Sequence, residues 1–496
     1  MKKRMLKIIA MGICAAVLTS CAGAINENNY DEIRSSYMPT IPYSEDLSEE
    51  EKKVDEWLSE LKAKAQKIDY GEGSFGAIDW DDEGYMNSEL YDFCLALPKG
   101  GDLHAHDETM IPVKDFVETV KASAKISLAG DTYGYLYATN NPDAPEDAVL
   151  LQDALAQGLI TEDELYDTLT LSEEDKDGGI WVNFERLFSV KLGLNTDDEL
   201  MGRIYEQGFR SCCEKGILLL EIRSILVTDD DENNLHFEEI IRDAYYRVKE
   251  DYPDFTVRII GNTGKNDFFS KELGCNVLNS FIRISKKLKD ESDPENPRDF
   301  IIGLDLVNEE DSSKPLSEYA DYFLSDEVQD CGMQLFLHCG ESLRSDNSSV
   351  IDAYLLGSAR VGHALNLYRF PKLMEKYSVD GIAVEVCPMS NYRLGYVDDL
   401  RLHPALTYLR NDIPVVICSD DGLFMSESPL VDDFFAAIMC WDLSLGDIKA
   451  LCRNSITYSG LPDDEKDSLM RAWEAQWAEF IKIYSQASSL PLPSAV

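Results

Sequence analysis

The sequence predicts a (β/α)₈ barrel with a helical extension before it and a long insertion after its first strand. Eight apolar runs recur from about residue 95 onward, and helical patterns separate them. Each run is nearly continuous in apolar residues, as expected for parallel strands covered on both faces. Eight such strands alternating with helices favour a barrel. The runs are CLALPKGGDLHAH, GILLLEIRSI, FTVRIIGN, FIIGLDLV, MQLFLHCGE, ARVGHAL, GIAVEVCP and PVVICSDD.

Length and composition fit this fold class. A chain of 496 residues with 44% hydrophobic and 28% charged residues is typical of a globular protein. The formal net charge of -46 disfavours non-specific binding to nucleic acid or to an anionic membrane, because both surfaces would be negative. We therefore expect a soluble surface and no nucleic-acid partner.

The N-terminus has the pattern of an export signal. Four basic residues precede a short apolar core, and small residues precede Cys21 in the segment LTSC. This segment resembles the lipobox of bacterial lipoproteins, in which the cysteine is lipidated. We predict a lipoprotein signal peptide at 1–20 and an exported protein attached to the bacterial cell envelope only through lipid on Cys21. An ordinary cleaved signal peptide is the alternative. No other stretch is long and apolar enough to span a membrane.

Between this signal and the barrel we expect a polar tether over 21–45 and a helical extension over 46–94. Val54, Leu58 and Leu61 recur at helical spacing in the extension. The barrel itself is predicted over 95–485. We interpret about 126–178 as an insertion, because the interval after the first strand is far longer than one crossover needs. A lid, a partner surface and mere decoration all fit that insertion, and the sequence favours no oligomeric state.

The twelve cysteines predict few disulfides. They are scattered, form no CxxC pair, and several lie in apolar strand-like runs where buried free thiols are common.

Polar residues cluster where the predicted strands end. The first strand ends with His104 and His106, the fifth with His338 and Glu341, and the sixth with His363. The eighth ends with Asp420 and Asp421. Barrel enzymes build their sites at this end of the strands. Four of the six histidines therefore share one predicted edge, whereas we interpret His236 and His403 as structural.

Three histidines and a carboxylate suit one Zn²⁺ per chain that keeps a position open for water. We expect His104, His106, His338 and Asp420 as the ligands. Zinc would lower the pKa of that water toward about 7, Glu341 would move protons, and His363 would hold the attacking oxygen. The fourth strand carries no lysine that might bridge a second metal, so one metal is predicted.

The motifs that carry this chemistry resemble, in order and spacing, those of the adenosine deaminase family. The resemblance spans about 95–460, and its closest form is the secreted adenosine deaminase-related growth factor type. It rests on LPKGGDLHAHD, LHCGES, RVGHALNL, VEVCPMSNYRLGYV and VICSDDGLF.

The resemblance implies hydrolytic deamination of adenosine, and of 2'-deoxyadenosine, to the 6-oxo product and ammonia. Glu341 would protonate purine N1, and Asp421 would share a proton with N7. Asp107 would approach the ribose hydroxyls, and Trp181 would lie over the pocket. Asn308 departs from the family pattern, which has glycine there to offer a backbone N–H to purine N3. Asn also adopts a left-handed backbone, but it adds a side chain near the substrate.

Two other functions fit the same residues. One is a deaminase of a different aminopurine derivative. The Asn308 side chain, where the family has glycine, is the reason to consider another substrate. The other is a catalytically silent nucleoside-binding lipoprotein, although a binding protein has no need of Glu341 as a proton carrier.

Overall fold

The computed structural model describes residues 30–69, 83–107, 109–129, 134–172, 175, 179–225, 228–266, 268–292 and 298–487. Two compact units divide at Pro42. The first contains helix α2 (Tyr30–Ser36), and everything below concerns the second. The predicted signal peptide and Cys21 lie outside the described residues.

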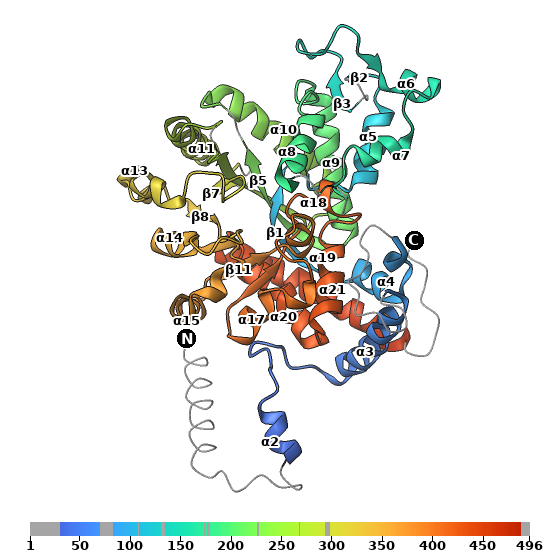
Figure 1. Ribbon diagram of the computed structural model, residues 1–496, viewed down its shortest axis with the longest axis vertical. Coiled ribbons are helices and arrows are strands. Elements are labelled where there is room, and N and C mark those ends of the chain that lie inside the picture. The colour runs from blue at the N-terminus through green and yellow to red at the C-terminus, as the bar shows by residue number, and fades with distance from the viewer. Residues whose placement is uncertain are drawn as a thin grey trace. The chain divides into compact units, whose positions relative to one another are not determined.

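Parallel strands surround the centre of the second unit, as predicted. One sheet has the order β1-β5-β6-β7-β8, and the other has the order β12-β11-β10-β9. Their bounds are β1 (Gly100–His106), β5 (Ile217–Ile225), β6 (Thr256–Gly264), β7 (Ile301–Val307), β8 (Gln334–Leu335), β9 (His338–Cys339), β10 (Arg360–His363), β11 (Ala383–Val386) and β12 (Val415–Ile417). Figure 1 shows helices outside these strands.

The two sheets join at both edges. At one edge β8 and β9 follow each other within residues 334–339, so a single chain segment contributes to both sheets. At the other edge Ala105 forms a parallel bridge with Asp420. The Asp420 N–H donates to the His104 carbonyl at 2.7 Å, and the His106 N–H donates to the Asp420 carbonyl at 3.2 Å. These bonds bring the ends of the first and last strands together.

Helices connect the strands and cover them. They are α9 (Asp198–Glu214), α10 (Asp231–Lys249), α11 (Lys271–Glu291), η3 (Leu316–Tyr319), α12 (Ala320–Phe323), α13 (Asp326–Gln329), α14 (Ser349–Leu355), η4 (Leu367–Arg369), α15 (Pro371–Asp380), α16 (Pro388–Arg393), η5 (Leu400–Leu402), α17 (Ala405–Arg410), α18 (Gly422–Met425), α19 (Val431–Trp441), α20 (Leu445–Thr457) and α21 (Asp463–Ala487).

Helix α11 illustrates how the sequence specifies these elements. The Ser270 hydroxyl caps it by accepting from the Leu273 N–H at 3.1 Å. Val277, Phe281 and Ile284 recur on one face and are buried. Each such side chain contributes about 1.5–3 kcal/mol on burial, so this face holds the helix against the barrel.

The N-terminal extension begins as predicted with an amphipathic helix, α3 (Glu49–Asp69), followed by η1 (Glu83–Asn87) and α4 (Glu89–Ala96). Ser48 and Glu51 cap the start of α3 reciprocally. The apolar face of α3 is buried against α21, α20 and α4.

One strand boundary was predicted wrongly. The apolar run from Cys94 to Leu97 ends helix α4, and β1 begins only at Gly100. A continuous apolar run does not distinguish a buried helix end from a strand start, and Pro98 marks the change between them.

A small separate sheet follows β1 and falls within the predicted insertion. Its strands β2 (Ile126–Ala129), β3 (Tyr135–Ala138) and β4 (Val149–Leu150) pair antiparallel in the order β3-β2-β4. Around it lie α5 (Val113–Ala122), α6 (Leu151–Gln157), α7 (Glu162–Asp167) and α8 (Ile180–Lys191). Figure 1 shows β2, β3, α6 and α7 grouped at one corner, away from β8 and β11.

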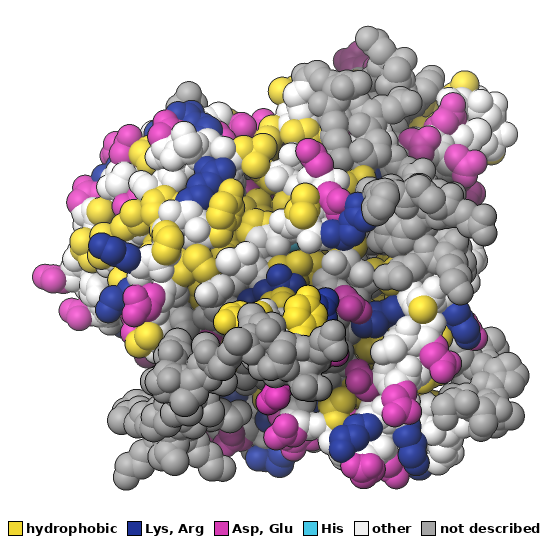
Figure 2. Space-filling model, turned by 60° about the horizontal axis from the view of Figure 1, so that its bottom comes forward, with side chains coloured by type: hydrophobic (Ala, Val, Ile, Leu, Met, Phe, Trp, Pro, Cys, Tyr) yellow, Lys and Arg dark blue, Asp and Glu magenta, His cyan; other side chains and the backbone are white. Residues whose placement is uncertain are grey.

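Charged side chains and cysteines are distributed as in a globular protein. On the face shown in Figure 2, acidic side chains are scattered among basic ones rather than collected in one patch. No disulfide joins any of the ten cysteines within the described ranges. Over the same ranges, we find no helix whose length and apolarity would let it cross a bilayer.

Candidate active site

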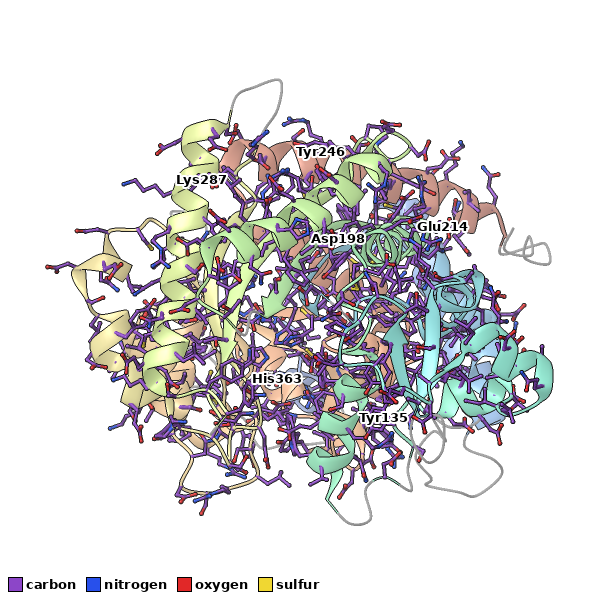
Figure 3. The ribbon with its side chains drawn as sticks, turned by 90° about the horizontal axis from the view of Figure 1, so that it is seen from above. Tyr135, Asp198, Glu214, Tyr246, Lys287 and His363 are labelled. Atoms are coloured by element: carbon purple, nitrogen blue, oxygen red, sulfur yellow. The ribbon has the colours of Figure 1, made fainter. Side chains whose placement is uncertain are left out.

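A cavity of about 480 Å³ opens at the carboxyl ends of the barrel strands. The side chains at its floor include His106, His338, Glu341, His363 and Asp420, the residues that the sequence placed at strand ends. Figure 3 labels His363, which lies well inside the molecule, whereas Lys287 and Tyr246 lie on outer helices. The barrel therefore brings these side chains together in one cavity.

The imidazoles and Asp420 converge closely enough to share one cation. Donor atoms of His104, His338, His363 and Asp420 lie within 4.8 Å of one another, and so do those of His106, Asp420 and Asp421. Asp420 belongs to both groups: its Oδ1 lies 3.4 Å from His104 Nε2 and 3.2 Å from His106 Nε2. The four ligands predicted from the sequence are drawn from both groups, and His363 is a further donor beside them.

Carboxylates orient two of the histidines from behind. His104 Nδ1 lies 2.7 Å from Glu385 Oε2, and His338 Nδ1 lies 2.6 Å from Asp305 Oδ2. A carboxylate only accepts from an imidazole, so each Nδ1 carries the hydrogen and each Nε2 lone pair is free for a metal. His104 Nε2 is buried and has no hydrogen-bond partner. This arrangement fits a zinc ion on the observed donor set.

A buried ionic layer lies beneath these histidines. Arg223 binds both Asp305, at 2.8 Å, and Glu385, at 2.6 Å. Arg360 binds Glu385 and also Glu221. All five side chains are fully buried, and three carboxylates against two guanidinium groups leave one excess negative charge. That charge favours a cation directly above.

Within the ionic layer, the arginines keep Asp305 and Glu385 ionised. Burial opposes ionisation of Asp305, but His338 and Arg223 outweigh it and hold the pKa of this carboxyl below its usual range. Burial likewise opposes ionisation of Glu385, and Arg223 and Arg360 lower its pKa. Both groups are therefore anions that accept from the histidines.

The pKa of Glu341, unlike those of Asp305 and Glu385, is raised. Burial, with the charges of Asp420 and Glu310, raises the pKa of its carboxyl well above the usual range. Its Oε1 is buried and has no hydrogen-bond partner, since the nearest imidazole nitrogen, His363 Nδ1, is 3.6 Å away. A protonated carboxyl facing the cavity is suited to donate a proton.

The adjacent acids Asp420 and Asp421 have pKa values shifted in opposite directions. Burial opposes ionisation of Asp420, but His104 and His106 lower its pKa well below the usual range. Burial and the Asp420 charge raise the pKa of Asp421 to about 6. Thr109 donates its hydroxyl to Asp421 Oδ1 at 2.7 Å. One carboxyl therefore suits a cation, and the other can share a proton with a ligand.

The predicted substrate residues Asp107, Asn308 and Trp181 all line the cavity. Asn308 has φ 88, the left-handed conformation expected in place of glycine, and its Oδ1 is buried without a hydrogen-bond partner. Trp181 Nε1 donates to the Tyr396 hydroxyl at 2.8 Å. Helix α8 is thereby tied to the segment that follows α16.

Helix α8 forms much of the cavity mouth. Phe184, Phe188 and Leu192 line the opening together with Trp181. The other end of this segment is held at Gly193, whose carbonyl accepts from the Ala138 N–H at 2.9 Å. A side chain at Gly193 would collide with the Leu136 carbonyl and the Tyr137 ring, so glycine permits this close approach.

Sequence reasoning missed the residues behind the site. Asp305 and Glu385 each interrupt an apolar strand run, as IIGLDLV and AVEV, and a lone carboxylate in a doubly covered strand is a signal that it has a buried partner. Asn391 lies in the short helix α16 and His403 directly follows η5, and neither element is long enough to give a periodic signal. Of the two histidines taken as structural, His236 is exposed and pairs with Asp198 at 2.9 Å, whereas His403 is buried and contacts Asn391.

The barrel and its site define an aminohydrolase. A family model for adenosine deaminase matches residues 272–475. The chain is 30% identical to an adenosine deaminase of Phlebotomus duboscqi over 470 residues, which cover 88% of this chain and 87% of that protein. It therefore belongs to the adenosine deaminase family.

Two further comparisons agree with this assignment. The chain is 26% identical to adenosine deaminase 2 of Dictyostelium discoideum, over 79% of this chain and 75% of that protein. Its fold is similar to that of an amidohydrolase from Burkhoderia ambifaria with bound Zn, with a TM-score of 0.57 and 16% identity. That similarity covers 80% of this chain and 95% of the other.

Proposed function

We propose that this enzyme is a zinc-dependent adenosine deaminase that converts adenosine and 2'-deoxyadenosine to their 6-oxo products and ammonia. The observation that carries the proposal is the buried His104, His338 and Asp420 cluster beside a Glu341 carboxyl whose pKa is raised. Family membership supports the reaction class.

One zinc ion per chain would be held by His104, His106, His338 and Asp420. The free Nε2 of His104, the carboxylates behind two of the imidazoles and the excess negative charge beneath support this ligand set. When bound, zinc supplies a water whose pKa is lowered toward about 7.

Glu341 moves the reacting protons, and His363 positions the attacking oxygen. The raised pKa of Glu341 favours the protonated carboxyl, which donates to purine N1 and makes C6 more electrophilic. His363 lies beside Asp420, with its Nε2 3.9 Å from Oδ2, and holds the attacking oxygen. The C6–O bond forms and the C6–N6 bond breaks; one proton of the attacking water leaves with the amino group as ammonia, and the other returns to Glu341 as the 6-oxo group forms.

The remaining residues orient the substrate. Asp421 shares a proton with purine N7, because its raised pKa permits a protonated carboxyl near neutral pH. Asp107 approaches the ribose hydroxyls, Trp181 covers the base, and Asn308 offers its backbone N–H toward N3. These four contacts follow the family resemblance, and all four residues line the cavity.

The cavity favours a nucleoside over its 5'-phosphate. Within the described part of the chain, the residues that line it include neither lysine nor arginine, whereas Asp107 and Glu185 add negative charge. A phosphate would therefore lose its water without gaining a cationic partner.

The test is a panel of adenosine, 2'-deoxyadenosine, adenine, N6-methyladenosine and AMP, assayed for ammonia or methylamine, with metal analysis of the same preparation. We expect adenosine and 2'-deoxyadenosine to be turned over fastest, AMP poorly, one zinc per chain, and loss of activity on chelation. A preference for another aminopurine would change the substrate. Zinc-loaded protein that binds adenosine without releasing ammonia would instead indicate a silent binding protein.

We further propose that residues 1–20 direct export and that lipid on Cys21 attaches the enzyme to the cell envelope. The basic start and the LTSC segment support this. Mass spectrometry of the mature N-terminus should find a lipidated cysteine, and Cys21→Ala should release the protein from membranes. A mature protein that begins elsewhere and lacks lipid would contradict the anchor.

A further inference from the structure

A chain of three buried side chains leads away from the cavity behind His363. The Ala405 N–H donates to His403 Nδ1 at 3.0 Å. His403 Nε2 lies 3.0 Å from Asn391 Oδ1, and Asn391 Nδ2 lies 3.2 Å from His363 Nδ1. His403, Asn391 and His363 are 2%, 0% and 1% exposed, so water does not compete for these bonds.

The direction of the chain follows from its first bond. A backbone N–H only donates, so His403 Nδ1 must hold a lone pair. Burial lowers the pKa of His403 to about 3, so this imidazole is neutral and its one hydrogen is on Nε2. That hydrogen requires an acceptor, which places Asn391 Oδ1 toward His403 and the amide NH₂ toward His363. His363 Nδ1 therefore accepts, and its hydrogen lies on Nε2.

The backbone holds His363 and Asn391 in place. His363 has φ 58, and Ala364 after it has φ 45, so a left-handed turn directs the imidazole off the end of β10. Asn391 lies within α16, and its own carbonyl accepts from the N–H groups of Tyr396 and Val397 at 3.0 Å each. Glu341 Oε1, at 3.6 Å from His363 Nδ1, is too distant to replace the amide.

Two other histidines of the site, His104 and His338, have the opposite arrangement. His104 and His338 donate Nδ1–H to Glu385 and Asp305 and turn a lone pair toward the metal position. We propose that Asn391 and His403 are positioning residues that hold His363 in the Nε2–H tautomer, which makes it a hydrogen-bond donor to the attacking oxygen and removes it from the metal ligands. Only the identity of that oxygen rests on the proposed function.

Nitrogen NMR tests the tautomers directly. With ¹⁵N-labelled histidine, long-range ¹H–¹⁵N spectra should resolve the six histidines, and single His→Gln variants assign them. We expect Nε2–H at His363 and His403 and Nδ1–H at His104 and His338, in metal-free and in zinc-loaded protein. Nδ1–H at His363 in the unmodified protein would overturn the proposal.

The variant Asn391→Asp tests the amide, because it keeps the shape and replaces a donor by an acceptor. We expect His363 to change to Nδ1–H, and kcat to fall about 10- to 100-fold with KM changed less and zinc content retained. The matched control is Asn454→Asp, in which the lost donor faced the Val415 carbonyl at 2.9 Å, remote from His363. It should leave the His363 tautomer and kcat unchanged. An Asn391→Asp protein with the native tautomer and native kcat would contradict the proposal.

A second pair of variants tests His403 should Asn391→Asp fail to fold. A glutamine at 403 can still donate to Asn391 Oδ1, whereas leucine cannot. We expect His403→Gln to retain the Nε2–H tautomer of His363 and most of kcat, and His403→Leu to lose both. Equal tautomers and equal kcat in the two variants would refute the role of His403. If the native enzyme releases no ammonia from any nucleoside, the proposed function fails, while the spectra still decide the tautomers.

Discussion

At the floor of the cavity, His104 and His338 are buried and rest on carboxylates that two buried arginines neutralise in part. At the mouth, Trp181 and Phe188 are partly exposed, and Leu192 is 53% exposed. The floor comes from the barrel strands, whereas the mouth comes from α8. The buried charges at the floor hold the reacting groups in one geometry. The aromatic side chains at the mouth are suited to contact a flat base. Changes at the floor should therefore cost more than changes at the mouth.

The largest effect is expected at Glu341. Glu341→Gln keeps the shape and removes the ionisable proton, so kcat should fall about 10²- to 10⁴-fold while zinc content stays the same. Glu375→Gln, at an exposed position of α15, is the control and should behave as the native enzyme does. The measurement is kcat with adenosine in steady-state kinetics. A native kcat in Glu341→Gln would refute the role of Glu341 as proton donor.

The next effect is expected in the ionic layer. Glu385→Gln weakens the acceptor behind His104 and leaves Arg223 and Arg360 with less compensation, so zinc affinity should fall about 10- to 100-fold. Glu221→Gln is the matched control, because Glu221 binds Arg360 and the Gly460 N–H. Both variants remove one negative charge from the layer and should lower Tm, but chelator competition should show the larger loss of zinc affinity for Glu385→Gln, because only Glu385 accepts from His104. Equal zinc affinity in the two variants would contradict the supporting role of Glu385.

A smaller effect is expected where the mouth is tied down. Tyr396→Phe removes the hydroxyl that accepts from Trp181, a bond of about 0.5–1.5 kcal/mol, which corresponds to a rise in KM of about 2- to 10-fold. Tyr354→Phe removes a comparable bond to Asp380 on the outer side of the barrel and should leave KM unchanged. A large fall in kcat with unchanged KM would show that Tyr396 acts at the floor instead.

The smallest effect is expected at Asn308. Asn308→Gly relieves a positive φ and removes a buried, unpartnered Oδ1, but glycine also has more freedom in the unfolded chain. The free energy of unfolding should change by no more than about 1 kcal/mol in chemical denaturation. KM should change less than in Tyr396→Phe, and a loss of activity of about 100-fold would mean that the Asn308 side chain itself contacts substrate.

Most of the floor could be predicted because strand ends carry a local signal. An apolar run that stops at His104, His338, His363 or Asp420 marks both the strand and the edge at which it ends. The same logic missed Asp305 and Glu385, although each stands out as a charge inside an apolar run. It also misplaced the start of β1, because the end of α4 and the start of the strand are equally apolar.

By itself the sequence determined the class of fold, the histidines and acids of the floor, and the family that their motifs resemble. All of these depend on residues that are close together in the chain or on a pattern that repeats along it. Only the tertiary structure decided the hydrogen-bond partners of those histidines. Asn391 and His363 are 28 residues apart, and His104 and Glu385 are 281 apart, and no local periodicity relates such pairs. Closure of the barrel brings them together, and the partner on Nδ1 then decides which imidazole offers a lone pair and which offers a proton.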